Sequence, residues 1–253
     1  MLEIGGIDLP LKPAGKGPVR RLTGGIHQAV KARGSNIYII TEPRLSLVDA
    51  GFPIDLPPIR GALRRLGADI TDLEWVVATH YHGDHVGTVA RLQRESGLKA
   101  AIHADDAPFA CGEVPYERFR YRPSRLLFYY SLYPLFRYRC FRPDLLLEEG
   151  AVLPLLGGIR VLHTPGHSRG SVCLFAESEG ILFTGDLVRN ERGVLEGPPP
   201  RFTPDPRRAA DSLLRLASLD FEMLLPGHGE PILGNAGAIF RRQLERGALW
   251  PVG

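Results

Sequence analysis

Three histidines and one aspartate lie within six residues of one another, at His80, His82, Asp84 and His85. Imidazole nitrogens and carboxylate oxygens without a thiolate favour zinc, iron or manganese over copper(I). The largely apolar segment 73–78 precedes them and a helical pattern begins near Asp84, so they occupy a turn between a strand and a helix. Open α/β folds place their ligands at such carboxyl ends of strands. The spacing therefore predicts a metal site in this turn.

The spacing within this turn also divides the four candidates. On a strand, side chains two residues apart point to the same face, so His80 and His82 are expected to bind one ion together. Asp84 and His85 lie past the strand end and are free to reach a second position. Tyr81 points to the opposite face and is predicted to belong to the core.

Three further candidates, His167, Asp186 and His228, each come directly after a glycine and after a predicted strand. Glycine permits the sharp backbone turn that directs such a side chain toward a shared centre. Each of the three taken alone would be an ordinary turn residue. Together with the first four they predict a set of seven ligands. In contrast, His27, His103 and His163 have no ligand-spaced neighbours and are interpreted as structural.

Hydrophobic periodicity indicates the elements that must position these side chains. Strands are expected at 17–30, 35–40, 45–51, 73–78, 99–103, 158–163, 172–175, 181–183 and 221–225. Helices are expected at 54–66, with Asp55 as N-cap and Gly67 after its end, and at 86–95, 207–217 and 235–246. Residues 193–206 have the Pro- and Gly-rich composition of a loop. Short strands that give way to strand–helix alternation are typical of half of an αββα sandwich.

The segment 80–85 matches the His-x-His-x-Asp-His signature of the metallo-β-lactamase superfamily, and the chain resembles its binuclear hydrolases, such as glyoxalase II and the metallo-lactonases, over residues 19–235. The resemblance implies an α/β fold, the αββα sandwich, and two divalent metal ions per chain. Zinc is the expected metal, with iron or manganese as alternatives. Six side chains would bind the ions, three to each: His80, His82 and His167 for the first, and Asp84, His85 and His228 for the second. Asp186 would bridge the two ions.

The implied chemistry is hydrolysis. Two bridged ions can share a water whose pKa falls from about 15.7 toward ~7, which provides hydroxide at neutral pH for attack on a carbonyl or phosphoryl centre. Asp84 could relay a proton as well as bind metal, so Asp84 and Asp186 are the expected catalytic carboxylates. Asp49, in Leu-Val-Asp-Ala-Gly, matches a superfamily position that orients a ligand without touching the metal.

Differences from the sequence motifs of known subfamilies narrow the range of possible reactions. Asp186 argues against a β-lactamase proper, because those enzymes usually lack an acidic bridging residue. The segment after Asp186 lacks the Gly-Cys-Gly-Arg stretch of glyoxalase II and of the persulfide dioxygenases, and Arg189 stands where acyl-homoserine lactonases have tyrosine. We expect a hydrolase of moderately apolar esters, thioesters or lactones. The alternatives are a mononuclear-iron oxidoreductase like persulfide dioxygenase and a phosphodiesterase that acts on RNA or nucleotides.

Residues 105–149 interrupt the regular alternation. Ten aromatic residues and seven arginines lie between residues 116 and 142. We expect an inserted helical lobe with one of three roles. It could be a lid, with Tyr129, Tyr133 and Arg189 in contact with substrate. It could instead be the interface of a homodimer or a surface for single-stranded nucleic acid.

Composition limits the remaining possibilities. With 253 residues, 44% of them hydrophobic, the chain is expected to form one domain over residues 1–253. A net charge of +3 does not indicate a nucleic-acid partner. No apolar stretch is long enough to span a membrane, and the first residues lack the apolar block of a signal peptide. Three scattered cysteines favour the reducing cytoplasm.

Overall fold

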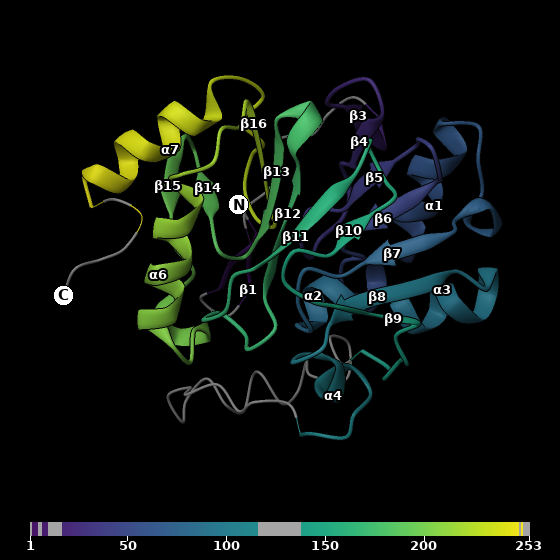
Figure 1. Ribbon diagram of the computed structural model, residues 1–253. Helices are drawn as coiled ribbons and strands as arrows, with labels where there is room; N and C mark the ends of the chain where they lie inside the picture. The colour runs from purple at the N-terminus through teal and green to yellow at the C-terminus, as the bar shows by residue number, and fades with distance from the viewer. Residues whose placement is uncertain (1, 5–6, 10–16, 116–137, 248, 250–253) are drawn as a thin grey trace.

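The computed structural model describes residues 2–4, 7–9, 17–115, 138–247 and 249. In these residues two β-sheets pack face to face, and helices cover the outer face of each sheet (Figure 1). This helix–sheet–sheet–helix order is the αββα sandwich that the sequence predicts.

The larger sheet contains seven strands, which neighbour one another in chain order: β3 (Val19–Arg21), β4 (Ile26–Ala29), β5 (Tyr38–Ile40), β6 (Ser46–Val48), β7 (Trp75–Val77), β8 (Lys99–His103) and β9 (Leu145–Leu147). The smaller sheet contains five strands, in the spatial order β10 (Val152–Leu153), β11 (Ile159–His163), β12 (Val172–Ala176), β13 (Ile181–Gly185) and β16 (Met223–Pro226). Two antiparallel pairs lie outside these sheets: β1 (Leu2–Ile4) with β2 (Ile7–Leu9), and β14 (Arg189–Glu191) with β15 (Val194–Glu196).

The period of two along each strand explains why the two sheets stack. Tyr38 and Ile40 of β5 pack into the core between the sheets, whereas Ile39 packs toward the helices on the outer face. In β12, Leu174 likewise faces the core between the sheets and Phe175 faces the other helical layer. Both faces of these strands are covered, so the strands are apolar on both sides.

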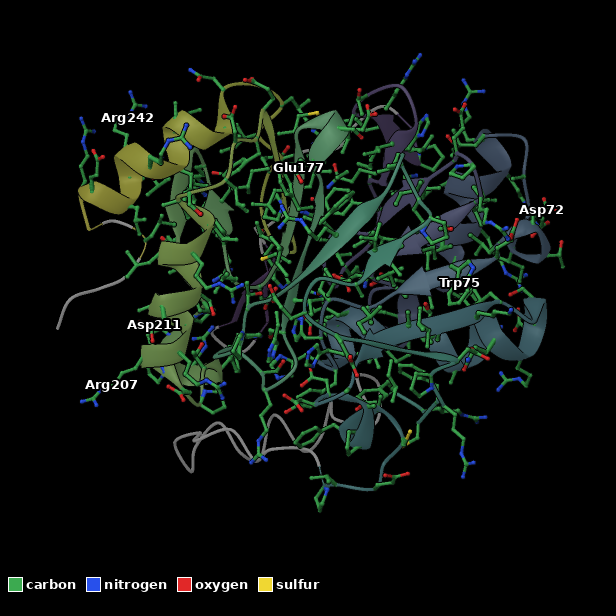
Figure 2. All side chains as sticks on the ribbon, viewed as in Figure 1. Asp72, Trp75, Glu177, Arg207, Asp211 and Arg242 are labelled. Atoms are coloured by element: carbon green, nitrogen blue, oxygen red, sulfur yellow. The ribbon has the colours of Figure 1, made fainter. Side chains whose placement is uncertain are left out.

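The helices are amphipathic and bury one face each. Helices α1 (Leu56–Arg65) and α3 (Val89–Ser96) cover the larger sheet, and α6 (Pro206–Leu216) and α7 (Ala236–Glu245) cover the smaller one (Figure 1). Figure 2 shows Arg207 and Asp211 of α6 and Arg242 of α7 on the outer surface, away from the sheets. None of the helices in the described part of the chain combines the length and the apolar character needed to cross a bilayer.

The carboxyl ends of several strands meet at one edge of the sandwich. Strands β6, β7, β8 and β9 are parallel to one another. In the smaller sheet β13 is parallel to β16, and β11 has the same direction because both β11 and β13 are antiparallel to β12. The turns that follow β6, β7, β11, β13 and β16 are therefore the natural place for a site.

Several predicted elements differ in detail. The predicted strand 17–30 is a hairpin of β3 and β4, and the predicted helix 86–95 is preceded by a separate turn, α2 (Gly83–Val86). The predicted loop 193–206 contains β15 and a short 3₁₀ turn, one of four in the described residues: Pro53–Asp55, Ile70–Asp72, Glu177–Glu179 and Pro200–Phe202. Asp55 occupies the N-cap position of α1, but its carboxylate accepts hydrogen bonds from the backbone N–H groups of Arg33, Gly34 and Phe52 instead of capping the helix.

The predicted helical lobe 105–149 is not confirmed. Its first part contains α4 (Ala107–Ala110), and β9 at its far end pairs in parallel with β8, so residues 145–147 belong to the larger sheet. Phe141 is buried in the core beneath that sheet, and the Tyr138 hydroxyl donates to the Phe109 carbonyl at 3.1 Å. Two of the ten aromatics are thus ordinary packing residues. The other eight, Tyr129 and Tyr133 among them, lie outside the described residues.

Candidate metal centre

Five turns at the carboxyl edge of the sandwich carry the predicted site residues. Asp49 follows β6, His80 to His85 follow β7, His167 follows β11, Asp186 follows β13 and His228 follows β16. β7 ends at Val77, so His80 and His82 lie in a loop and not on a strand, contrary to the sequence-based expectation. Their side chains converge all the same, and their ligand nitrogens lie within 4.8 Å of that of His167.

One group of three nitrogens comes from His80, His82 and His167. His82 Nδ1 lies 3.0 Å from His80 Nε2 and 2.9 Å from His167 Nε2. A neutral imidazole carries a single N–H, so hydrogen bonds cannot satisfy all three nitrogens at once. The separations are close to the roughly 3.3 Å expected between ligand atoms around a tetrahedral zinc ion with bonds of about 2.0–2.1 Å. The three nitrogens therefore fit a cation better than they fit one another.

The pKa values of these three histidines also favour the binding of a cation. Burial lowers the pKa of His80 well below its ordinary value, that of His82 to about 3, and that of His167 to about 4. The three imidazoles are therefore neutral at pH 7, and a neutral imidazole is the form that binds a metal.

A second group comes from Asp84, His85 and His228. Asp84 Oδ2 lies 3.2 Å from His228 Nε2 and 3.9 Å from His85 Nε2. The side chains of Asp84 and His228 are 26% and 21% exposed, whereas His85 is fully buried. Because His80, His82 and His167 are also buried, the described residues of the centre are most exposed at Asp84 and His228.

Asp186 lies between the two groups and presents a different oxygen to each. Its Oδ2 lies 3.3 Å from His167 Nε2, and its Oδ1 lies 3.1 Å from His85 Nε2 and 3.3 Å from His228 Nε2. His85 Nε2 and Asp186 Oδ1 are buried and have no hydrogen-bond partner among the described residues. Orphaned polar atoms of this kind indicate a missing partner, and a single ion bound at the second group would satisfy both atoms.

The charges of Asp84, Asp186 and His85 depend on one another. Burial would raise the pKa of both carboxyl groups, but neighbouring histidines outweigh it: His228 and His85 hold the pKa of Asp186 well below its usual range, and the same two lower the pKa of Asp84. Burial would lower the pKa of His85, but Asp49, Asp186 and Asp84 together raise it well above the ordinary value. The second group thus concentrates negative charge where a divalent cation would bind.

Asp49 contacts His85, one of the predicted ligands. Its Oδ2 lies 2.8 Å from His85 Nδ1, which leaves Nε2 of the same ring facing Asp186. Asp49 Oδ1 accepts a hydrogen bond from the Thr79 backbone N–H at 2.8 Å, and the Thr79 hydroxyl lies 3.1 Å from His80 Nδ1. The sequence-based reasoning missed Thr79. Its position between a buried strand and the first ligand was the available signal.

Two residues that the sequence did not single out hold the turn that carries His228. Asn36 Nδ2 and the Tyr38 hydroxyl both donate to the Pro226 carbonyl, at 2.8 and 2.7 Å. Both donors belong to the larger sheet or its approach, so they fix a turn of the smaller sheet from across the sandwich. The polar Asn36 in an apolar strand pattern was the only sequence signal.

Gly227 provides a prediction about this turn. A Cβ at this position would lie 2.7 Å from Asp186 Oδ1 and 2.8 Å from the Gly185 carbonyl. We expect Gly227→Ala to displace Asp186 and to weaken metal affinity at least about 10-fold, a loss in the range of changes that misorient ligands. Competition with a chelator measures the affinity. Gly234→Ala is the control, since a Cβ at Gly234 meets nothing within 4 Å; equal affinities of the two variants would contradict the prediction.

The remaining predicted residues divide into three cases. Tyr81 is buried in the core and stacks on Phe109 with ring centroids 4.4 Å apart, as predicted. Arg189 is half-buried in β14, and its Nη2 lies 2.8 Å from Glu191 Oε1. Contact of Arg189 with a substrate therefore remains a proposal. Tyr129 and Tyr133 lie outside the described residues.

His103 and His163, interpreted as structural from the sequence, lie against each other in the structure. Their rings stack with centroids 4.0 Å apart, and Asp105 lies near both. However, His103 Nδ1 accepts a hydrogen bond from the Asp105 backbone N–H, and His163 Nε2 lies 2.8 Å from the Arg169 carbonyl oxygen. The nitrogens that face Asp105 are thus already engaged, which supports the structural interpretation over a third metal site.

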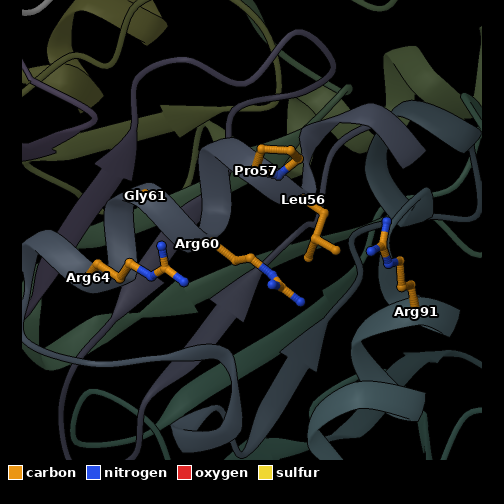
Figure 3. Close-up of a pocket in the computed structure, with 6 residues that line it drawn as sticks. All are labelled: Leu56, Pro57, Arg60, Gly61, Arg64 and Arg91. Carbon is orange, nitrogen blue, oxygen red and sulfur yellow. The ribbon is translucent and has the colours of Figure 1, made fainter.

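A surface hollow on the helical layer is separate from the metal centre. Figure 3 shows Leu56, Pro57, Arg60, Gly61 and Arg64 of α1 and Arg91 of α3 around it. None of the seven predicted ligands lines it. Arg60 and Arg91 both form ion pairs with Glu95, so their charges are already paired within the protein.

The chain forms a four-layer αββα sandwich, and a buried cluster of histidines and aspartates lies at the carboxyl edge of its strands. Both features are those expected of a metallohydrolase. Residues 30–228 match the model of the metallo-β-lactamase superfamily, and the chain belongs to this superfamily of metal-dependent hydrolases. The fold and the ligand groups together imply that it binds a divalent metal.

Two relatives and one solved structure show how similar the chain is to known proteins. The probable metallo-hydrolase YflN of Bacillus subtilis (strain 168) is 30% identical over 245 residues, which cover 89% of this chain and 92% of that protein. The acyl-coenzyme A thioesterase MBLAC2 of Gallus gallus is 32% identical over 214 residues, which cover 77% and 72%. Among solved structures, the subclass B3 metallo-β-lactamase BJP-1 of Bradyrhizobium japonicum has a TM-score of 0.68 at 18% identity, with 95% and 93% covered. That likeness shows the shared fold.

Proposed function

We propose that this chain is a binuclear metal-dependent hydrolase that cleaves a thioester, ester or lactone of moderately apolar character. The position of Asp186 carries the proposal, because its two carboxylate oxygens face two separate groups of nitrogen ligands. A carboxylate in this arrangement is suited to bridge two ions. A mononuclear site would not require the second group, and the ligand atoms of its three members lie within 4.8 Å of one another.

The ligand set favours zinc. Five imidazoles and two carboxylates without a thiolate match the donors that zinc accepts, and iron or manganese are the alternatives for the same donors. When bound, two such ions lower the pKa of a shared water and polarise the substrate's carbonyl oxygen.

The residues of the chain have distinct tasks in this proposal. Asp186 and the three imidazoles of His80, His82 and His167 form the buried wall of the site, where solvent is excluded. Asp84 is the more exposed carboxylate and lies 3.2 Å from His228 Nε2 at the open side. As an ionised group it is thus placed to accept a proton and pass it to a leaving group. A low-dielectric wall and an ionised carboxylate at the mouth suit a neutral carbonyl substrate.

Thioesters come first among the three bond types, because a relative with 32% identity is named as an acyl-coenzyme A thioesterase. A panel of acyl thioesters, oxyesters, lactones and phosphodiesters, assayed with protein loaded with zinc, manganese or iron, tests the proposal. We expect the highest kcat/KM among the carboxylic substrates. Preference for phosphodiesters, with binding that weakens steeply with salt, would replace the proposal with a nuclease. Oxygen uptake with a persulfide would replace it with a dioxygenase.

A further prediction concerns the aromatic segment as a lid. If it roofs the site, each added methylene in the acyl chain contributes about 0.8 kcal/mol, so kcat/KM rises roughly fourfold per carbon until the space is filled. Replacing residues 116–137 with a Gly-Ser linker should remove this trend. The replacement must not extend over 105–149, because β9 and the buried Asp106 lie within that range. A flat profile in the intact protein would end the lid hypothesis. Loss of dimerisation alone, by light scattering, would favour an interface.

A further inference from the structure

Asp106 is a buried carboxylate that contacts two of the ligand-bearing turns. It lies three residues after the end of β8 and is fully buried. Its Oδ2 accepts hydrogen bonds from the Tyr81 backbone N–H at 3.1 Å and from the Ser168 hydroxyl at 2.7 Å. Its Oδ1 accepts from the Gly170 backbone N–H at 2.7 Å.

These donors are the immediate neighbours of metal ligands. Tyr81 lies between His80 and His82, and Ser168 follows His167. The first turn belongs to the larger sheet and the second to the smaller sheet. Asp106 therefore connects the turn that carries His80 and His82 to the turn that carries His167, two turns that are far apart in the sequence. Strand β12 adds one further link, from the Val172 backbone N–H to the Thr79 carbonyl at 2.9 Å.

The turn that carries His167 packs closely against Asp106. A Cβ at Gly170 would lie 2.7 Å from the Asp106 backbone nitrogen and 2.8 Å from its carboxyl carbon, so the turn after His167 is packed directly on Asp106. Ser168 and Ser171 also contact each other through their hydroxyls at 2.7 Å. The turn that carries His167 is thus closed on itself and fastened to Asp106.

We propose that Asp106 is a positioning residue for the ion bound by His80, His82 and His167. It fixes the distance between the two turns that supply these ligands, and it touches neither the ion nor the substrate. The inference rests on the proposed function, because it assumes an ion at these three histidines. It extends that function by naming the residue on which this one ion, and not its neighbour, depends.

Asparagine at this position should break the connection without changing the size of the side chain. An amide has one acceptor oxygen and one donor NH₂, and each oxygen of Asp106 faces an N–H donor. In either orientation the NH₂ group would therefore face a backbone N–H, and buried donors without acceptors are costly. Ser168→Ala is a milder second variant, which removes the hydroxyl contacts to Asp106 and Ser171 but leaves the Asp106 carboxylate and its two backbone donors in place.

The experiment separates the two ions by disabling one group at a time. In a His228→Ala background the ion at His80, His82 and His167 is the one retained, and in a His167→Ala background the ion at Asp84 and His85 is retained. Zinc affinity is measured by chelator competition, and cobalt(II) absorption reports the geometry of the retained ion. Asp144→Asn is the matched control, since Asp144 Oδ2 accepts from the Ala100 backbone N–H in β8, the strand that precedes Asp106, and contacts no ligand turn among the described residues.

We expect Asp106→Asn to weaken zinc binding about 10- to 100-fold in the His228→Ala background and to leave it unchanged in the His167→Ala background. Ser168→Ala should cause a smaller loss in the same background only. Equal losses in both backgrounds, or no loss in either, would overturn the inference. If Asp106→Asn does not fold, Ser168→Ala decides the question by the same criterion. Failure of the unsubstituted protein to bind a second ion would instead contradict the proposed binuclear function and leave the His228→Ala comparison valid.

Discussion

Asp186→Asn is expected to lose one of the two ions and to lower kcat/KM at least about 100-fold while the fold persists. The reason is the double role of this side chain. Oδ1 and Oδ2 face different nitrogen groups, and an asparagine would present a neutral NH₂ to one of them. That NH₂ carries no lone pair for a metal. Asp186 is almost fully buried, so no water could take over the lost ligand without rearrangement.

Metal content by mass spectrometry, circular dichroism and turnover of the best substrate measure the three parts of this prediction. Asp205→Asn is a suitable control, because Asp205 caps α6 through its contact with the Arg208 backbone N–H, and asparagine caps equally well. Two ions per chain and near-normal turnover in Asp186→Asn would sink the bridging assignment.

Asp49→Ala is expected to weaken metal affinity about 10- to 100-fold, the range typical of groups that orient a ligand. Asp49 holds His85 through Nδ1 at 2.8 Å and is itself held by Thr79. Without the carboxylate, His85 could rotate, and the charge that favours a cation beside it would be lost. Asp49 also has a backbone φ of 58°, in the left-handed region that non-glycine residues seldom adopt. Such a conformation is commonly retained where a functional site requires it.

Chelator competition again provides the measurement, with Asp211→Ala on the exposed face of α6 as the control. If the Asp49→Ala protein binds metal as tightly as the control, Asp49 is only a turn residue. A loss confined to the ion near His85 would match the contact described above.

Local sequence patterns predicted half of an αββα sandwich and the position of each ligand turn, and the resemblance to the metallo-β-lactamase superfamily implied the whole sandwich. Glycines beside His167, Asp186 and His228, together with apolar strands before them, are short-range signals, and they place each side chain at a strand end. The strands themselves are apolar on both faces, so they could be recognised as apolar runs without an alternation of apolar and polar residues.

The sequence could not indicate which distant residues hold the turns in place. Asp106 contacts Tyr81 and Ser168, which lie 25 and 62 positions away, and no local pattern encodes such a pairing. The stacking of His103 on His163 is likewise a product of the tertiary fold. The predicted lobe 105–149 failed at its far end for the same reason, because β9 is recognised as part of the sheet only by its pairing with β8.

The most direct test of the binuclear site is the metal content of protein purified without chelator. Elemental analysis is expected to give two equivalents of divalent metal per chain, with zinc as the main element, and removal of the metal should abolish hydrolysis until an ion is restored. One equivalent of iron per chain that cannot be raised to two by added metal would contradict the account.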